Sequence, residues 1–146
     1  MSTNIISNDK NLAANLNLGI KKDGKKKKLN LSLNVDSIIP HNLNFTNRLK
    51  ESNISFKIEA TASGEDLDNA TMRANIYDFR LRTPQQYWKI RHMHIADNSI
   101  DKKRNLIVNS DIINGYLTGY YERNTLGNSF KNILRRYIPS LIGDND

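Results

Sequence analysis

The sequence predicts an α+β domain with a mainly antiparallel sheet of about four to five strands, two C-terminal helices and a flexible basic arm at the N-terminus. Three observations support this fold class. Positive charge is concentrated in residues 1–28, strict alternation of apolar and polar residues begins at Leu29, and apolar residues recur at helical spacing after Ser110. We therefore expect residues 1–28 to form a separate arm and residues 29–146 to form a single domain.

The arm is defined by its charge. Residues 1–28 contain seven lysines and two aspartates, a net charge of +5 out of +7 for the whole chain. Like charges repel, and no apolar residue anchors the stretch 21–28, so this stretch is predicted to be mobile. Before it, Ser7, Leu12, Leu16 and Gly19 suit a short helix with a cap at each end, and a disordered arm is the equal alternative.

The middle of the chain reads as strands. One strand is expected where Leu29, Leu31, Leu33 and Val35 alternate with polar residues, and a second where Ile54, Phe56, Ile58 and Ala60 do the same. Further strands are predicted at residues 75–82, 86–96 and 105–108. Two interruptions are expected, a short helical stretch through Phe45 and Leu49 and a turn at residues 63–66.

Two helices are predicted after the strands. Ser110 is a candidate cap for a stripe formed by Ile112, Ile113, Tyr116, Leu117, Tyr120 and Tyr121. A second stripe comprises Leu126, Phe130, Ile133, Leu134, Tyr137, Ile138 and Leu141, and Pro139 should end or kink that helix. Because the strands come first and the helices follow, we expect the helices to pack on one face of the sheet.

No motif indicates catalysis, and we expect a protein that is not an enzyme and has neither cofactor nor metal. Cysteine is absent, which excludes disulfides and thiolate metal sites, and no phosphate loop, dinucleotide motif or nucleophile elbow occurs. The pair His92 and His94 would share one face of a strand, but two histidines do not complete a metal shell. The acidic residues Glu65, Asp66 and Asp68 lack the spacing of a calcium loop and suit a solvated turn.

The basic residues predict a surface that binds a polyanion. A lysine-rich arm neutralises phosphates without reading sequence, and polybasic segments also bind anionic lipid. A second basic stripe would form on two successive strands if these pair, with an ordinary solvated strand face as the alternative. The candidate residues for binding nucleic acid or anionic lipid are Lys21, Lys22, Lys25, Lys26, Lys27, Lys28, Arg80, Arg82, Lys89 and Arg91.

A second candidate surface lies on the first predicted helix. Gly115 and Gly119 are one turn apart, which permits close approach of another helix, and Tyr116 and Tyr120 are of the type enriched at interfaces. We therefore predict a homo-oligomer with these four residues at the contact. The alternative is that both glycines pack against the protein's own sheet.

The arm followed by a compact domain resembles the layout of small viral coat proteins. The lysine-rich stretch 19–28 also resembles the arm of rhabdovirus-type matrix proteins, although the proline-rich tyrosine motif of many such arms is missing. The 21 asparagines and 17 isoleucines suggest an AT-rich genome, such as that of a virus, a phage or a low-GC bacterium. The function expected from sequence is thus a structural or assembly protein that binds RNA or DNA through its arm, with a matrix-like protein at a membrane surface as the alternative. Its expected location is intracellular, soluble or peripheral to a membrane, or in a virion.

Overall fold

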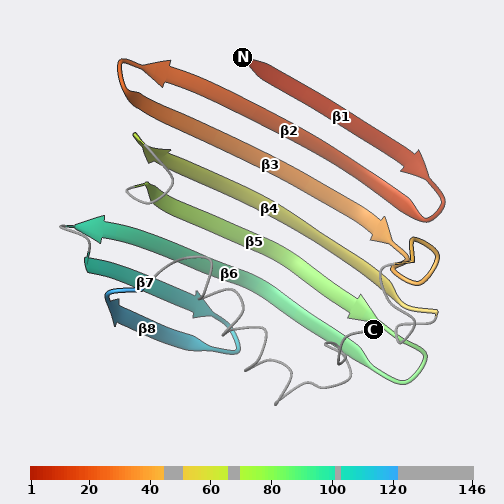
Figure 1. Ribbon diagram of the computed structural model, residues 1–146. Helices are drawn as coiled ribbons and strands as arrows, with labels where there is room; N and C mark the ends of the chain where they lie inside the picture. Colours follow the sequence, from red (N-terminus) through yellow and green to blue (C-terminus); the bar gives the residue numbers. More distant parts are fainter. Residues whose placement is uncertain (45–50, 66–69, 101–102, 122–146) are drawn as a thin grey trace.

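The computed structural model describes residues 1–44, 51–65, 70–100 and 103–121, and they form one antiparallel sheet of eight strands (Figure 1). The strands are β1 (Ser2–Asp9), β2 (Leu12–Asp23), β3 (Lys26–Ile38), β4 (Asn53–Gly64), β5 (Thr71–Arg82), β6 (Tyr87–Ile100), β7 (Lys103–Ser110) and β8 (Asn114–Gly119). Each strand pairs with the next one along the chain, so the order across the sheet is β1 to β8 without a crossover.

The α+β prediction is wrong for the described part of the chain, which contains strands and no helix. The predicted helix after Ser110 is instead a turn followed by β8. Tyr116 and Leu117 point to opposite faces of this edge strand. They therefore do not lie on one side, as the predicted helical stripe requires. The predicted second helix and the stretch from Phe45 to Leu49 lie outside the described residues.

The arm is also not flexible as predicted, because β1, β2 and the first residues of β3 belong to the sheet. The short helix expected between Ser7 and Gly19 is replaced by the β1–β2 hairpin. At the lysine-rich end, Asp23 pairs with Lys26, and Gly24 has a φ of +57° in the two-residue turn between them. A glycine with positive φ at the first turn position favours a tight hairpin. The turn therefore orders the lysine-rich stretch that charge repulsion alone predicts to be mobile.

The sheet has one apolar and one polar face, because successive side chains of a strand point to opposite sides. On the apolar face, Leu18 pairs with Leu31, which pairs with Ala60, and this row continues to Ala74, Ile95 and Val108. On the polar face, the neighbouring row is Asn17, Ser32, Glu59, Asn75, His94 and Asn109. We use the names apolar face and polar face for these two sides below.

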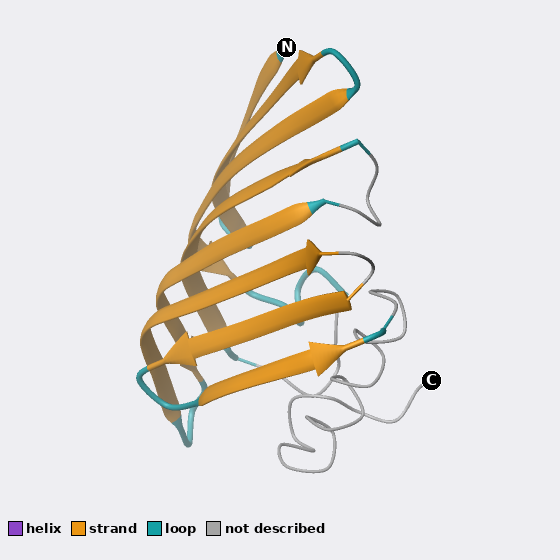
Figure 2. Ribbon diagram, turned by 90° about the vertical axis from the view of Figure 1, so that its left-hand side faces the viewer, coloured by secondary structure: helices purple, strands orange, loops and turns teal. Residues whose placement is uncertain are grey.

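The strands bend along a line of irregular pairs in β2 to β5. Pairing shifts by one residue between Ala13 and Ala14, between Val35 and Ile38, and between Ser55 and Lys57. Asp78 is the extra residue of β5 at the last shift and has a φ of 49°. Bulges of this kind increase local twist and bending, and Figure 2 shows the sheet as a curved, open layer.

Two of the four buried apolar side chains of the described chain lie close to this bend. Val35 and Leu81 are almost fully buried, and the Phe56 and Phe79 rings stack with their centroids 6.4 Å apart. The apolar face also holds a buried ion pair, in which Arg104 Nη1 lies 3.5 Å from Asp97 Oδ2. The described residues include no helix that is both long and apolar enough to cross a membrane.

Candidate functional site: a basic groove on the polar face

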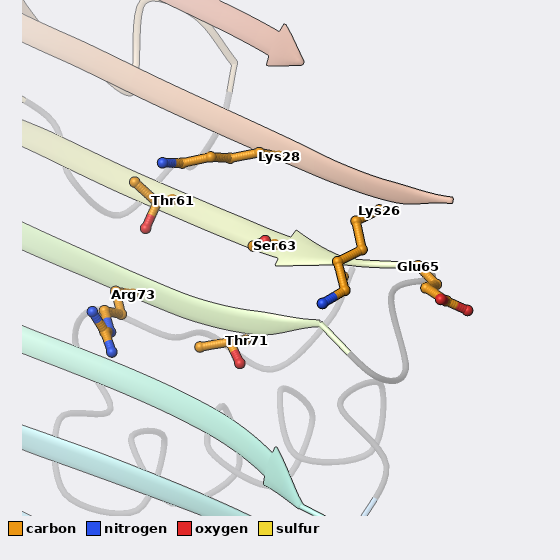
Figure 3. Close-up of a pocket in the computed structure, with 8 residues that line it drawn as sticks. Lys26, Lys28, Thr61, Ser63, Glu65, Thr71 and Arg73 are labelled. Atoms are coloured by element: carbon orange, nitrogen blue, oxygen red, sulfur yellow. The ribbon is translucent and has the colours of Figure 1, made fainter. Parts of the chain in front are cut away.

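A basic groove with a volume of about 740 Å³ lies on the polar face where β3, β4 and β5 meet. It is lined by three cations, three hydroxyl side chains, a glycine and one carboxylate: Lys26, Lys28, Arg73, Thr61, Ser63, Thr71, Gly64 and Glu65. Figure 3 shows the two lysines reaching over β4 from one side and Arg73 standing on β5 at the other side. We call this set of residues the basic groove.

The sheet register explains why these residues meet. Lys28 pairs with Ser63 and Ser63 with Thr71, while Thr61 pairs with Arg73 in the next row of the same face. Rows two residues apart along a strand share a face, so the cations and hydroxyls point to the same side. A cation surrounded by hydroxyl donors is the chemistry that binds phosphate and carboxylate oxygens.

Among the described residues, none of the three cations of the groove forms an ion pair, although Asp23 lies opposite Lys26 in the β2–β3 pairing. Glu65 lines the groove, but in Figure 3 its carboxylate points away from Lys28 and Arg73. Other cations of the described chain are paired: Lys57 with Glu59 at 2.7 Å, Arg80 with Asp78 at 3.3 Å and Arg91 with Asp111 at 3.2 Å. Within the described chain, the groove therefore concentrates positive charge that no ion pair neutralises.

The remaining lysines of the predicted set divide between the two faces. Lys21 lies opposite Lys28 and extends the polar-face charge, whereas Lys22 lies opposite Lys27 on the apolar side. Lys25 is in the turn. Like charges directly opposite one another on paired strands are destabilising, so this end of the β2–β3 hairpin carries repulsion that a bound anion would relieve.

A second, neutral hollow of about 540 Å³ adjoins the basic groove on the polar face. It lies over β1, β2 and β3, where Gly19 has no side chain, and its other lining residues are Ser2, Thr3, Asn4, Asn17, Leu18, Asn30, Leu31 and Ser32. Asn30 pairs with Thr61 of the basic groove. Amide and hydroxyl groups thus continue the surface from the cations toward the edge of the sheet.

The second predicted basic stripe is brought together only in part. Arg80 pairs with Lys89 on the polar face, and Arg82 pairs with Tyr87, with its guanidinium carbon 5.9 Å from the ring centroid. Arg91 is held by Asp111. The Arg91 backbone N–H donates a hydrogen bond to the Asp111 carboxylate, which lowers the pKa of that carboxyl below its usual value.

His92 and His94 share the polar face, as predicted, but both rings contact one amide. Their nearest nitrogens lie 3.3 Å and 2.9 Å from Asn75 Oδ1, and His92 stacks on Tyr77 at 5.0 Å. Among the described residues no third histidine or carboxylate completes a metal shell with them. Strict alternation along β6 would place Trp88 on the same face as His92, but Trp88 pairs with Leu81 on the apolar face.

The residues of the predicted oligomer contact lie on or next to a strand rather than on the predicted helix. Gly115 and Gly119 lie on the edge strand β8 rather than on a helix, and a Cβ atom at either position would meet no other atom within 4 Å. Close helix approach is therefore not their role. Tyr116 is exposed on the polar face of β8, and Tyr120 is exposed just after the strand.

Sequence reasoning missed Arg73 and the hydroxyl residues of the groove. Residues 63–66 were expected to form a turn and the next strand to start at residue 75, so Arg73 had no assigned place. The signal was the continued alternation of Thr61 and Ser63 beyond Ala60 and of Arg73 before Asn75.

Comparison of the chain with protein-family models, with curated proteins and with solved structures found no match in any of the three.

Proposed function

We propose that this protein is a non-enzymatic structural protein that binds nucleic acid, RNA or DNA, through the basic groove without reading base sequence. The proposal depends on one observation. Lys26, Lys28 and Arg73 converge on one groove with hydroxyl groups between them, and none of them forms an ion pair with a carboxylate within the described chain. Contacts of this type to phosphate position a nucleic acid but carry no sequence information.

The lining favours a phosphate backbone over a lipid surface. Its described side chains are charged or hydroxylated, and none of the described lining residues is a large apolar one. Binding to a bilayer through a polybasic patch gains from apolar groups that enter the interface, which this groove lacks. The neighbouring hollow of asparagines and serines offers amide and hydroxyl partners for further phosphates or sugars.

A triple substitution tests the proposal. Lys26→Gln, Lys28→Gln and Arg73→Gln together remove three potential phosphate contacts, so the slope of log affinity against log salt should become shallower by ~2–3 units for duplex DNA at ~0.9 per contact. The matched control is Lys57→Gln, because Lys57 lies on the same face but is bound to Glu59 at 2.7 Å. The control should leave the slope nearly unchanged.

Vesicles containing phosphatidylserine distinguish binding to anionic lipid from binding to nucleic acid. We expect weak or no flotation of the wild-type chain with such vesicles at the salt concentration at which it binds duplex DNA or single-stranded RNA. An unchanged salt slope in the triple variant would contradict the proposed groove. Flotation that depends on the same three cations, without binding to nucleic acid, would replace the proposal by the membrane alternative.

A further inference from the structure

Among the described residues, the sheet ends on two edge strands, β1 and β8, and no further described strand pairs with either. Natural sheets blunt their edges with lysine, proline or bulges, because unpaired backbone groups recruit other strands. β1 (Ser2–Asp9) and β8 (Asn114–Gly119) contain no lysine, arginine or proline, and their pairings show no bulge. In the described part of the chain, no hydrogen bond reaches the outer side of either strand.

Exposed apolar side chains gather at the same two edges. Ile5 and Ile6 of β1 are 57% and 61% exposed, and Tyr116 and Leu117 of β8 are 84% and 44% exposed. Further exposed apolar residues of the described chain flank these strands or lie on their neighbours: Met1, Ile20, Ile107, Ile112, Ile113 and Tyr120. Only Tyr87 and Trp88, at the start of β6, lie elsewhere. Exposed apolar groups clustered in this way mark interaction surfaces.

The outward backbone groups of both edges can be assigned. Met1 and Ile20 exchange two backbone hydrogen bonds, so alternation turns the N–H and C=O groups of Ser2, Asn4, Ile6 and Asn8 outward. The Ser110 N–H bonds the Ile113 carbonyl, so Asn114, Tyr116 and Thr118 turn theirs outward on β8. All of these side chains lie on the polar face.

We propose that copies of this chain join head to tail, with β8 of one copy pairing with β1 of the next. An even number of strands makes β1 and β8 run in opposite directions, so this junction is antiparallel like the seven junctions within the sheet. Because the outward residues of both edges carry their side chains on the polar face, the polar and apolar faces continue across the junction. In this arrangement, Ile6 of one copy and Tyr116 of the other lie on the polar face at the junction, where the added strand reduces their exposure.

Head-to-tail pairing covers both edges with one type of contact. A two-fold dimer through β1 or through β8 would leave the other edge exposed, whereas a repeated heterologous contact closes into a ring or continues as a filament. The sheet is already curved, as Figure 2 shows. This inference uses the edges alone and stands apart from the basic groove.

Two complementary edge variants test the arrangement. Ile6→Pro removes an outward N–H of β1, and Tyr116→Pro removes one of β8, while neither position donates a hydrogen bond to its neighbouring strand. We expect the untagged wild-type chain to associate in sedimentation velocity with rising concentration. Each variant alone should stay monomeric, and an equimolar mixture should form a dimer, because each variant keeps the edge that the other lacks.

Circular dichroism and thermal unfolding establish that each variant is folded, and Ile6→Lys with Tyr116→Lys serve as a second pair if proline disrupts a strand. A wild-type chain that stays monomeric at every concentration would overturn the inference. So would self-association of the β1-intact variant or of the β8-intact variant alone, since that indicates a two-fold contact. Variants that assemble as the wild type does would place the contact on another surface.

Discussion

At the scale of single residues, ion pairs hold several charged side chains of the described chain outside the groove. Lys57 is hydrogen-bonded to Glu59, which raises the pKa of the lysine, and its ammonium lies 5.8 Å from the Tyr77 ring centroid. Arg80 and Arg91 likewise have carboxylate partners. Lys26, Lys28 and Arg73 differ from these cations because they form no ion pair among the described residues. The residue type alone does not reveal which lysines and arginines are paired in this way.

Asp111 gives a pH-dependent prediction. The hydrogen bond from the Arg91 backbone N–H holds the pKa of this carboxyl below its ordinary value of 3.8. A lowered folded-state pKa adds stability that is present above the unfolded pKa and lost as the pH falls through the folded pKa. Asp111→Asn should therefore be less stable than wild type at neutral pH, and the difference should vanish below the lowered pKa.

Urea unfolding at a series of pH values measures this difference, and an NMR titration of the Asp111 carboxyl reports the pKa itself. A difference in unfolding free energy that stays constant down to strongly acidic pH would show that the asparagine acts through packing and not through the charge.

The buried ion pair of the apolar face gives a second prediction. The side chains of Asp97 and Arg104 are only 10% and 8% exposed, and the Tyr121 hydroxyl donates to Asp97 at 3.4 Å. Asp97→Leu leaves a buried guanidinium without this carboxylate, which should destabilise the protein by ~3–5 kcal/mol. Adding Arg104→Leu should recover part of that loss, and a double-mutant cycle in urea measures the coupling. A double variant no more stable than Asp97→Leu would contradict this account.

At the scale of elements, the strands with regular alternation were predicted from sequence and the two ends of the sheet were not. Leu29 to Val35 and Ile54 to Ala60 lie in β3 and β4, and the predicted strands at residues 75–82, 86–96 and 105–108 are confirmed as parts of β5, β6 and β7. Apolar residues on one side of each strand fix its register, so the pattern and the structure agree there.

The ends failed because other signals competed with alternation. In the N-terminal segment, the hairpin signal Asp23-Gly24 was outweighed by the charge of the lysines, although Leu16, Leu18 and Ile20 alternate before it. At the other end, an edge strand exposes both faces, so Tyr116 and Leu117 imitate a helical stripe. Two glycines within that stripe, each unfavourable in a helix by ~1 kcal/mol, were the evidence against it.

The groove could be predicted only in part for the same reason. Lys26 and Lys28 were recognised by composition, but their meeting with Arg73 depends on the pairing of β3 with β4 and of β4 with β5. A register across three strands is a long-range property that one sequence does not specify beyond its apolar pattern.

The facing lysines of the β2–β3 hairpin give an element-scale prediction. Lys22 and Lys27 lie opposite each other on the apolar side, away from the basic groove. Lys22→Glu replaces a repulsive pair by an attractive one, which should stabilise the protein by ~0.2–1 kcal/mol and raise the melting temperature by up to ~4 °C, at ~2–4 °C per kcal/mol for a chain of this length. Binding to nucleic acid should change little, in contrast to Lys28→Glu.

Thermal unfolding at low and high salt checks the cause. Salt screens exposed charges, so the gain from Lys22→Glu should shrink as the ionic strength rises. A gain that does not depend on salt would assign the effect to strand propensity rather than to charge.

At the scale of the whole molecule, the basic groove and the edge strands β1 and β8 belong to one continuous sheet. The basic groove spans β3 to β5, and the neutral hollow reaches β1, so a β8–β1 junction would place the polar surface of the next copy beside it. Repeated copies would then present their grooves along one assembly. Linked weak phosphate contacts gain from effective concentration, which connects assembly to binding.

Residues 1–28 contribute β1, β2 and the start of β3 to the sheet. Sequence alone favours a domain that folds without them, whereas the structure pairs Leu16 with Leu33 and Leu18 with Leu31. A chain that starts at Leu29 loses β2 and exposes the flank of β3, so we expect it to be less stable by at least ~2 kcal/mol, given ~0.8 kcal/mol per buried CH₂. The control deletes residues 1–10, which removes only the exposed edge strand β1 and should lower the melting temperature far less. The deletion of residues 1–10 should nevertheless abolish head-to-tail association, because it removes β1, the strand with which β8 of the neighbouring copy is proposed to pair. Equal melting temperatures for the intact chain and the chain from Leu29 would show that β2 adds nothing to the folded domain.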